Sequence, residues 1–322
     1  MKTLAVLTSG GDSPGMNACI RAVVRTALFH KMEIWGIMRG YEGLMESEFV
    51  KLDAKSVANI IHRGGTVLKT ARSKRFMEEA GQKVAAKNLE AKGIEGLITI
   101  GGDGTFRGAV ALGGQTNVKI IGCPGTIDND LVGTDFTIGY DTAINTVVDA
   151  VDKIRDTAES HERLFFVEVM GRDAGLIALR SGIGAGAEAI LIPETPTHID
   201  DLISRLESGR KDKASKIVIV SEHDDAGGAF AIAEKVKEKL PYYDTRVTVL
   251  GHIQRGGNPS CMDRVNASRM GFAAVEALMA GRGGEMVGII DKEVCFTPFE
   301  QAIKHLEELD PSLMRMVEIL SL

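Results

Sequence analysis

Residues 96–105 read Gly-Leu-Ile-Thr-Ile-Gly-Gly-Asp-Gly-Thr, an apolar run that ends in a glycine-rich turn around one aspartate. The run from Leu97 to Ile100 is uninterrupted, which is typical of a parallel strand covered on both faces. The glycines around Asp103 let the backbone turn sharply or approach a ligand closely, and a helical pattern begins there. This stretch therefore predicts a strand, a tight turn and a helix.

The same order of strand, turn and helix recurs along nearly the whole chain. We expect strands at residues 4–7, 33–38, 96–100, 119–121, 164–169, 189–192, 216–220, 248–250 and 286–290, and helices at residues 14–31, 78–92, 141–159, 199–208, 229–240 and 263–279. This alternation predicts an α/β fold with doubly wound, mostly parallel sheets. The length of 322 residues allows about two domains. We place a boundary near residue 138 and expect the chain to return near residue 250.

The amino-acid composition excludes several classes of protein. Lys and Arg total 38 and Asp and Glu total 44, so the formal net charge is −6, without a global basic field for nucleic acid. No apolar run approaches the ~20 residues of a membrane span, and the start of the chain lacks the apolar stretch of a signal peptide. The four cysteines show no metal-ligand spacing. We therefore expect a cytoplasmic enzyme, with neither nucleic acid nor a membrane as a partner.

Glycine is in excess, with 37 residues against about 23 at an average usage of ~7%. The turn Thr8-Ser9-Gly10-Gly11-Asp12 exposes N–H groups at the start of a helix, which suits a phosphate. The turn around Asp103 leaves space for a polyphosphate, and its carboxylate can hold Mg²⁺ directly or through water. Each turn also fits a structural strand–helix connection with an aspartate cap, so neither decides the function alone.

The loop Pro124-Gly125-Thr126-Ile127-Asp128-Asn129-Asp130 follows another predicted strand and carries two carboxylates two residues apart. Like charges held close together raise one pKa, which makes a general base plausible. A structural cluster of Asx turns is the alternative interpretation.

Arginines and glycines also gather at strand ends in the second half of the chain. Met170-Gly171-Arg172 follows one strand, Gly251-His252-Ile253-Gln254-Arg255 follows another, and Glu222 follows a third. Arg163 and Arg246 precede two of these strands. An arginine fork binds phosphate oxygens, so the set predicts convergence on an anion, although each arginine taken singly fits a surface ion pair.

In this order and spacing, the segments TSGGDSPGMN, GGDGT, PGTIDND, EVMGR and GHIQRGG resemble the bacterial ATP-dependent 6-phosphofructokinase family over about residues 1–290. The resemblance implies two Rossmann-like domains with the active site in the cleft between them, in a homotetramer. It implies a glycolytic kinase that transfers the γ-phosphoryl of Mg-ATP to the 1-hydroxyl of fructose 6-phosphate. ATP would bind residues 1–138, with a return of the chain at about 251–300, and the sugar phosphate would bind residues 139–250. Residues 301–322 would form a C-terminal helical tail.

The resemblance also implies roles for individual residues. Asp128 would be the general base, Asp103 would hold Mg²⁺, and Thr126 and Arg172 would stabilise the transferring phosphoryl. The implied ATP-binding residues are Gly11, Arg72, Ser73, Gly102, Asp103, Gly104 and Thr105. The implied sugar-phosphate residues are Thr126, Ile127, Asp128, Arg163, Met170, Gly171, Arg172, Glu222, Arg246, His252, Ile253, Gln254 and Arg255, of which Arg163 and Arg246 would come from a neighbouring subunit.

A second implied site lies between subunits and binds ADP or GDP as an activator and phosphoenolpyruvate as an inhibitor. Its residues would be Arg21, Arg25, Arg155, Gly186, Glu188, Lys211 and Lys213. The chain departs from the family's usual pattern at Ser73-Lys74-Arg75, where x-Pro-Glu is common, and this departure could alter ATP affinity. It also departs at Leu176 and at Asn59, where aspartates are common.

Alternatives come from related and unrelated classes. Pyrophosphate-dependent members of the family typically carry Asp at the position of Gly104 and Lys at that of Gly125, so these two glycines favour ATP. NAD kinases and lipid kinases share GGDGT but not the other segments. A catalytically silent nucleotide sensor remains an alternative, although every acid and arginine the chemistry needs is present. A Rossmann dehydrogenase is excluded because no GxGxxG is followed by a ribose-binding acid in the right βαβ unit.

Overall fold

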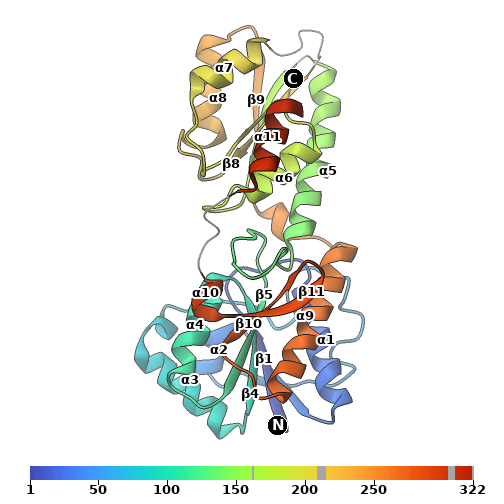
Figure 1. Cartoon of the computed structure of the whole chain (residues 1–322), viewed down its shortest axis with the longest axis vertical. Helices are drawn as coiled ribbons and strands as arrows, with labels where there is room; N and C mark the ends of the chain where they lie inside the picture. Colours follow the sequence, from blue (N-terminus) through green and yellow to red (C-terminus); the bar gives the residue numbers. More distant parts are fainter. Residues whose placement is uncertain (162, 209–214, 304–308, 321–322) are drawn as a thin grey trace. The chain divides into compact units, whose positions relative to one another are not determined.

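The computed structural model describes residues 1–161, 163–208, 215–303 and 309–320 of the chain. It divides into two compact units, coloured along the sequence in Figure 1. The first unit comprises Met1–Thr142 and Arg255–Leu306, and the second comprises Ala143–Gln254 and Glu307–Leu322. Each unit therefore joins segments that lie far apart in the sequence. The predicted division of ATP and sugar phosphate between two domains stays a prediction.

The first unit is built on a seven-stranded sheet in the order β11-β10-β5-β4-β1-β2-β3. Five neighbouring strands, from β10 to β2 in that order, are parallel, and an antiparallel strand closes each edge. The strands are β1 (Thr3–Thr8), β2 (Glu33–Ile37), β3 (Phe49–Lys51), β4 (Gly96–Gly101), β5 (Lys119–Pro124), β10 (Glu285–Ile290) and β11 (Glu293–Pro298).

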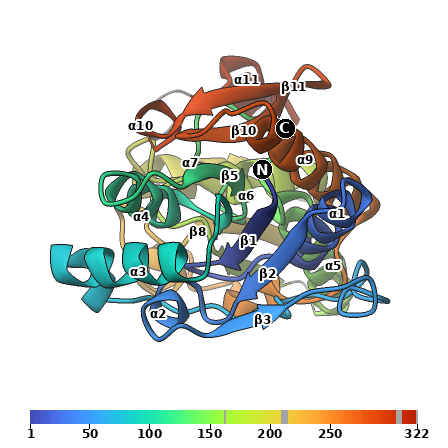
Figure 2. The ribbon, with the colours of Figure 1, turned by 90° about the horizontal axis from the view of Figure 1, so that it is seen from below.

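Helices cover both faces of this sheet, as Figure 2 shows. Because side chains alternate along a strand, Leu4 and Val6 of β1 join one core with helices α1 (Met16–Phe29) and α9 (Cys261–Met279). Ala5 and Leu7 join a second core on the other face. The helices there are α2 (Gly40–Met45), α3 (Glu79–Ala91), α4 (Asp103–Gly113) and α10 (Phe299–Ala302). Burial on both faces explains why the central strands read as continuous apolar runs.

The second unit has a four-stranded parallel sheet in the order β7-β8-β6-β9. Its strands are β6 (Arg163–Val169), β7 (Ala189–Leu191), β8 (Lys216–Ser221) and β9 (Asp244–Val249). Its helices are α6 (Leu176–Gly184), α7 (Ile199–Ser208), α8 (Gly228–Lys239) and α11 (Pro311–Leu320), and the division between units falls within α5 (Tyr140–Glu159). Helix α11 contacts α6. The predicted α/β class with mostly parallel sheets is confirmed.

The structure contains elements that the sequence patterns did not indicate. Strands β3 and β11 and helices α2 and α6 were not expected, and β9 begins at Asp244 rather than at residue 248. Strand β9 lies at the edge of its sheet and is only partly buried, so it lacks the continuous apolar run of a central strand. Within the described residues, no helix has both the length and the apolar character needed to cross a membrane.

Candidate active site

The carboxyl ends of β1, β4 and β5 bring the three glycine turns of the first unit side by side. The parallel register pairs Thr8 with Ile100 and Gly101 with Pro124, so the three strands end at nearly the same level. The backbone N–H of Ser9 donates a 3.0 Å hydrogen bond to the carbonyl oxygen of Ile100, which extends the pairing into the first turn. Ligands of open α/β sheets bind beyond this edge.

The turn around Asp103 is held by the side chain of its own Thr105 and by the side chain of Tyr41 from another segment. The Thr105 hydroxyl donates to the carbonyl oxygen of Ser9 at 3.0 Å, and the Tyr41 hydroxyl of α2 donates to the carbonyl oxygen of Thr105 at 2.7 Å. The Tyr41 ring stacks on Phe76 with centroids 4.1 Å apart. Burial raises the pKa of Tyr41. Tyr41 was not predicted as a site residue, because a lone tyrosine in a glycine-rich segment carries no motif.

The same turn offers a carboxylate suited to a nucleotide-bound magnesium ion. Asp103 is the first residue of α4, its side chain is 20% exposed, and the Arg107 guanidinium lies 3.9 Å away. A Cβ atom built on Gly104 would meet no atom within 4 Å, so space is open beside the turn. The described residues contain no group of three potential metal ligands. Mg²⁺ at nucleotide sites takes one or two carboxylates, with phosphates and water as the other ligands, so Asp103 fits.

The loop after β5 buries the predicted base. Asp128 is 7% exposed and Thr126 is 8% exposed. The backbone N–H of Asp128 donates to the Thr126 hydroxyl at 3.2 Å, and that hydroxyl lies 3.4 Å from Asp128 Oδ2. Ile127 is fully buried, so its side chain is closed to a ligand. The geometry keeps the carboxylate and the hydroxyl of this loop next to one another.

Asn129 has a structural role in this loop. Its φ of 56° is in the left-handed region, which asparagine tolerates better than most residues. The Asn129 side chain accepts from the N–H of Thr137 at 2.6 Å and donates to the carbonyl oxygen of Asp135 at 3.1 Å. The Thr137 hydroxyl donates to the carbonyl oxygen of Thr126 at 2.6 Å. These bonds fix the backbone that carries Asp128.

Two predicted residues from distant segments meet at the first turn. A Cβ atom on Gly11 would lie 2.8 Å from Arg255 Nη1, and this nitrogen donates to the carbonyl oxygen of Asp12 at 3.3 Å. Gly11 thus leaves the space that the Arg255 guanidinium fills. Of the other predicted ATP residues, Arg72 is exposed and the Ser73 hydroxyl donates to Glu42 of α2.

In the second unit, the turn after β6 is bonded to the segments that follow β8 and β9. The N–H of Met170 donates to the fully buried Gln254 side chain at 3.2 Å. The N–H of Arg172 donates to Glu222 Oε1 at 2.9 Å. Gly171 and Arg172 have φ values of 146° and 56°. The short 3-10 helix Gly251–Arg255 carries the exposed residues His252 and Ile253.

The two remaining arginines of the predicted sugar-phosphate set lie elsewhere in the second unit. Arg163 and Arg246 both contact the carboxylate of Asp244, at 2.7 Å and 3.0 Å. The Arg163 hydrogen bond is the main cause of the lowered pKa of Asp244. Arg163 begins β6, so it lies about 20 Å along the strand from Val169, at ~3.3 Å per residue. Within this chain, Arg163 therefore lies at the other end of β6 from Met170 and Arg172, and the predicted convergence of these arginines on an anion stays a prediction.

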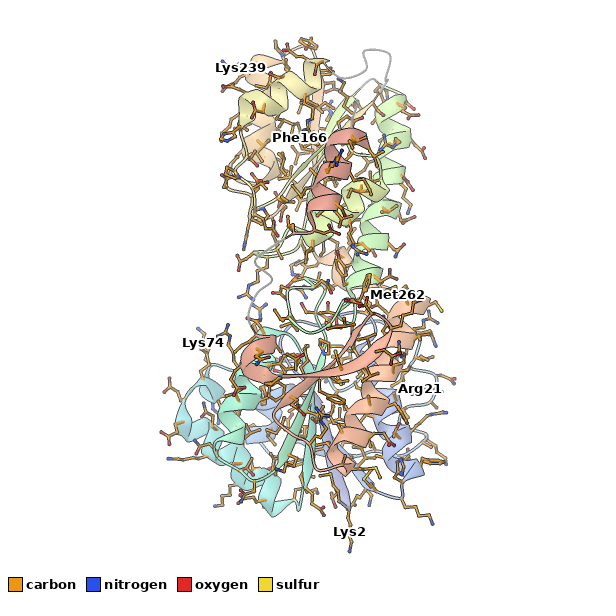
Figure 3. All side chains as sticks on the ribbon, viewed as in Figure 1. Lys2, Arg21, Lys74, Phe166, Lys239 and Met262 are labelled. Atoms are coloured by element: carbon orange, nitrogen blue, oxygen red, sulfur yellow. The ribbon has the colours of Figure 1, made fainter. Side chains whose placement is uncertain are left out.

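The predicted effector residues are spread over both units. Arg21, labelled in Figure 3, and Arg25 lie one turn apart on α1 of the first unit. Burial and the neighbouring Arg25 lower the pKa of Arg21. In the second unit, the Arg155 guanidinium donates to the carbonyl oxygen of Gly186 at 3.4 Å, and Glu188 Oε2 accepts from the N–H of Ile217 at 2.5 Å. Lys211 and Lys213 lie outside the described residues.

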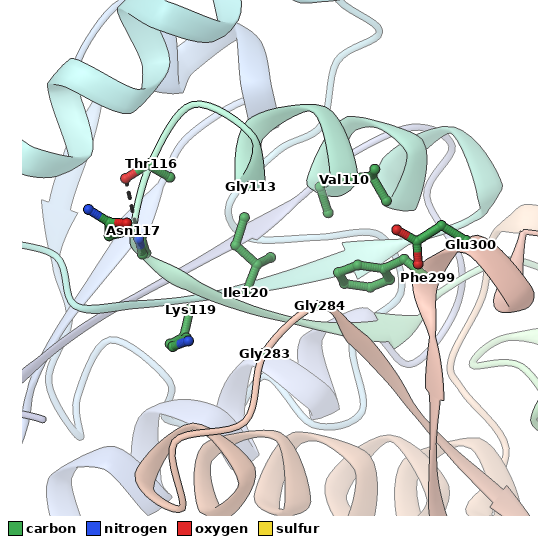
Figure 4. A pocket seen from close by; sticks show the side chains of 12 residues that line it. Val110, Gly113, Thr116, Asn117, Lys119, Ile120, Gly283, Gly284, Phe299 and Glu300 are labelled. Carbon is green, nitrogen blue, oxygen red and sulfur yellow. Dashed lines mark hydrogen bonds between the residues drawn. The ribbon is translucent and has the colours of Figure 1, made fainter.

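A pocket of about 340 Å³ lies away from the glycine turns, at the amino end of β5 (Figure 4). Its lining comes from the end of α4, the start of β5, the segment before β10 and the start of α10. None of the residues predicted to bind substrate, nucleotide or effector lines it. Its position gives it no role in the candidate active site.

Glycine-rich turns and carboxylates at the carboxyl edge of a parallel sheet are typical of α/β enzymes that bind phosphate groups. The family model described as phosphofructokinase matches residues 3–278. The chain therefore belongs to the phosphofructokinase family, and the resemblance noted from the sequence is confirmed.

Similar proteins include the ATP-dependent 6-phosphofructokinase of Cytophaga hutchinsonii, which is 53% identical over 100% of this chain and 98% of its own length. The ATP-dependent 6-phosphofructokinase 1 of Thermus thermophilus is also 53% identical, over 100% of both chains. Among solved structures, the phosphofructokinase from Saccharomyces cerevisiae matches with a TM-score of 0.87 and 35% identity. The match covers 100% of this chain and 47% of the yeast chain.

Proposed function

We propose that this chain is an ATP-dependent 6-phosphofructokinase, which phosphorylates the 1-hydroxyl of fructose 6-phosphate in glycolysis. The observation that carries the proposal is the 53% identity, over the full chain, to relatives with that name. The placement of Asp128 beside Thr126, on the loop next to the turn around Asp103, supports it. The proposed reaction and its small substrates fit a cytoplasmic enzyme.

The proposed reaction is a direct phosphoryl transfer. The sugar 1-hydroxyl oxygen forms a bond to the γ-phosphorus of ATP, the bond from that phosphorus to the β,γ-bridging oxygen breaks, and ADP leaves. Asp128 accepts the proton of the hydroxyl, while Thr126 and Arg172 donate hydrogen bonds to the oxygens of the transferring group. Asp103 would hold a magnesium ion together with the phosphates, and the ion would supply positive charge that neutralises the polyphosphate.

The remaining roles divide between the two substrates. The proposed ATP-binding residues are Gly11, Arg72, Ser73, Gly102, Gly104 and Thr105. The proposed sugar-phosphate residues are Ile127 through its backbone, Met170, Gly171, Glu222, His252, Ile253, Gln254 and Arg255. Backbone N–H groups of glycine turns and forked guanidinium groups are the donors that phosphate oxygens prefer.

A coupled assay with fructose 6-phosphate as acceptor tests the proposal, using ATP and pyrophosphate as alternative phosphoryl donors. We expect turnover with Mg-ATP and at least ~100-fold less with pyrophosphate, because Gly104 leaves open space where an acid would repel the nucleotide. Preference for pyrophosphate would contradict the donor assignment. Lack of turnover with both donors would contradict the proposed activity.

We further propose that the enzyme is a homotetramer in which Arg163 and Arg246 serve the sugar-phosphate site of a neighbouring copy. Arg163 begins β6 and Arg246 pairs with Phe165, so they lie about 23 Å and about 17 Å along the strands from the level of Met170, which supports this assignment. Mixing an Arg163→Ala protein with an Asp128→Ser protein should restore activity, since some hybrid sites combine two intact halves. Hybrids that form and stay inactive would contradict shared sites.

We also propose an effector site for ADP, GDP and phosphoenolpyruvate at Arg21, Arg25, Arg155, Gly186, Glu188, Lys211 and Lys213. Arg21 and Arg25 lie one turn apart on α1, and burial together with the charge of Arg25 lowers the pKa of Arg21, so the pair of guanidinium groups suits an anion. Saturation curves for fructose 6-phosphate should shift to lower concentration with ADP and to higher concentration with phosphoenolpyruvate. Superimposable curves would show that the effectors do not favour different states of the enzyme.

A further inference from the structure

Glu42 of helix α2 and Glu46, the residue that caps its C-terminus, share one guanidinium. Arg75 Nη1 lies 3.0 Å from Glu42 Oε1 and 2.6 Å from Glu46 Oε1. Glu42 and Glu46 are four residues apart, so they lie on the same face of the helix. The contact raises the pKa of Arg75, chiefly through its hydrogen bond to Glu46. The segment that contains Arg75 is therefore held against α2 by paired charges.

Glu42 also holds the residue next to Arg72. The Ser73 hydroxyl donates to Glu42 Oε2 and accepts a hydrogen bond from the N–H of Phe76 at 3.1 Å. The two carboxylate oxygens of Glu42 are thus divided between Ser73 and Arg75, and this carboxylate is only 21% exposed. The interactions fold residues 73–76 into a compact turn on the helix.

The same helix reaches the other predicted nucleotide segment. Phe76 is 5% exposed and stacks on Tyr41, whose hydroxyl donates to the carbonyl oxygen of Thr105. Helix α2 therefore touches the segment after Arg72 on one side and the turn around Asp103 on the other. A shift of residues 72–76 away from α2 would change the distance between these two groups of nucleotide-binding residues.

We propose that Glu42 and Arg75 are positioning residues that fix the Arg72–Phe76 segment on helix α2 and thereby set the affinity for the nucleoside triphosphate. The proposal rests on the proposed function, since it takes ATP to be the ligand of this segment. With Arg75 engaged by two carboxylates, the exposed cations left on the segment are Arg72 and Lys74, the latter labelled in Figure 3. The contacts of Glu42 with Ser73 and Arg75, which we call the clamp, order these cations before the nucleotide arrives. This order lowers the conformational entropy lost on binding.

Steady-state kinetics of Arg75→Ala, Glu42→Ala and the double variant test this proposal. We expect each single variant to raise the KM for ATP by about two- to fivefold, the range that a partly exposed ion pair supports. The kcat and the KM for fructose 6-phosphate should stay within about twofold of wild type. Because both residues act through one contact, the double variant should raise the KM for ATP little more than the worse single variant. Arg75→Lys, which keeps the charge but not the fork, should be intermediate.

The matched control is Arg282→Ala, which removes another two-contact arginine–glutamate pair from the first unit, with Glu285, and should leave all three kinetic constants unchanged. Thermal melting of every variant checks that the fold is retained. An unchanged KM for ATP in active Arg75→Ala and Glu42→Ala enzymes would overturn the clamp and leave the proposed function standing. Absence of ATP-dependent turnover in the wild type would overturn the proposed function instead. In that case, calorimetric titration of wild type and variants with Mg-ATP would still decide the clamp.

Discussion

The two units hold their predicted phosphate-handling residues in different ways. In the first unit, Asp128 and Thr126 are 7% and 8% exposed and sit on a loop tied down by buried hydrogen bonds. In the second unit, the side chains of Arg172 and Ile253 are 51% and 56% exposed. Burying a carboxylate costs free energy, and the hydrogen bonds of Asn129 and Thr137 hold the loop that keeps Asp128 buried. Exposed side chains keep their water until a ligand arrives.

The contrast between the two units shows that a proton acceptor and an anion-binding residue require different surroundings. A proton acceptor has to stay within hydrogen-bond reach of one atom, so its loop is fixed. Residues that capture an anion from solvent can remain exposed, provided that their backbone is anchored, as the N–H groups of Met170 and Arg172 are by Gln254 and Glu222.

The largest effect is expected from Asp128→Ser. Removing the proton acceptor should lower kcat by at least ~100-fold, the lower range for general acid–base catalysis, with little change in the KM for fructose 6-phosphate. Asp135→Ser is the matched control, since Asp135 is an exposed carboxylate on the same loop. Near-normal turnover of Asp128→Ser in the coupled assay would refute the assignment of the base.

The next prediction separates the effect of charge from the effect of side-chain size, and it concerns Gly104 and Gly125 of the first unit. Gly104 has open space, whereas a Cβ at Gly125 would lie 3.0 Å from Met16 Cε and 3.3 Å from the N of Gly101. Gly104→Asp should therefore fold normally and raise the KM for ATP by about tenfold, through a unit charge placed near the polyphosphate. Gly104→Asn, of nearly equal size but neutral, should have a much smaller effect. Equal effects of the two variants on the KM would point to size and away from charge.

A smaller effect is expected from Glu222→Ala in the second unit. This variant removes the carboxylate that anchors the N–H of Arg172, so the KM for fructose 6-phosphate should rise about three- to tenfold, or about 0.7–1.4 kcal/mol, within the range of an ordinary hydrogen bond. The melting temperature should change little, because the site is exposed.

Thr137→Val in the first unit should instead lower the free energy of unfolding by about 1–3 kcal/mol, because it leaves the buried carbonyl of Thr126 without this donor. Loss of stability in Glu222→Ala but not in Thr137→Val would contradict the contrast between the units.

The smallest effect concerns Asp263 of α9, which accepts hydrogen bonds from the N–H groups of Gly139 and Thr142, both at 2.8 Å. Burial raises the pKa of Asp263 to about 6. In the unfolded chain the pKa of an aspartate is about 3.9, so the folded protein binds more protons between pH ~4 and ~6. The contribution of Asp263 to the free energy of unfolding should therefore fall as pH rises through this window.

Chemical denaturation of wild type and Asp263→Asn between pH 4 and 7 measures this dependence. The variant should lack the part of the slope that comes from one titrating carboxyl. Asp149→Asn, at a side chain that is 70% exposed, should keep the wild-type slope. Parallel curves for wild type and Asp263→Asn would show that the carboxylate is ionised throughout this range, held by its hydrogen bonds.

Much of the candidate site could be predicted from the sequence because its residues act through local geometry. Glycines beside Asp103 specify a turn that only small residues allow, and an apolar run before them specifies a buried strand. Other residues carry no such signal. The bond from Tyr41 to Thr105 and the pair of bonds from Asn129 to the Asp135–Thr137 segment depend on folding distant or looped segments together.

By itself, the sequence determined the α/β class, the three glycine turns and the residue types that phosphoryl transfer needs, because these follow from periodicity and backbone freedom within a few residues. Only the tertiary structure decided which strand ends meet. It placed Gly11 against Arg255, and it placed Asp263 against the N–H groups of Gly139 and Thr142. Those outcomes depend on strand order and register, which form through contacts between segments more than a hundred residues apart and leave no trace in any short window of sequence.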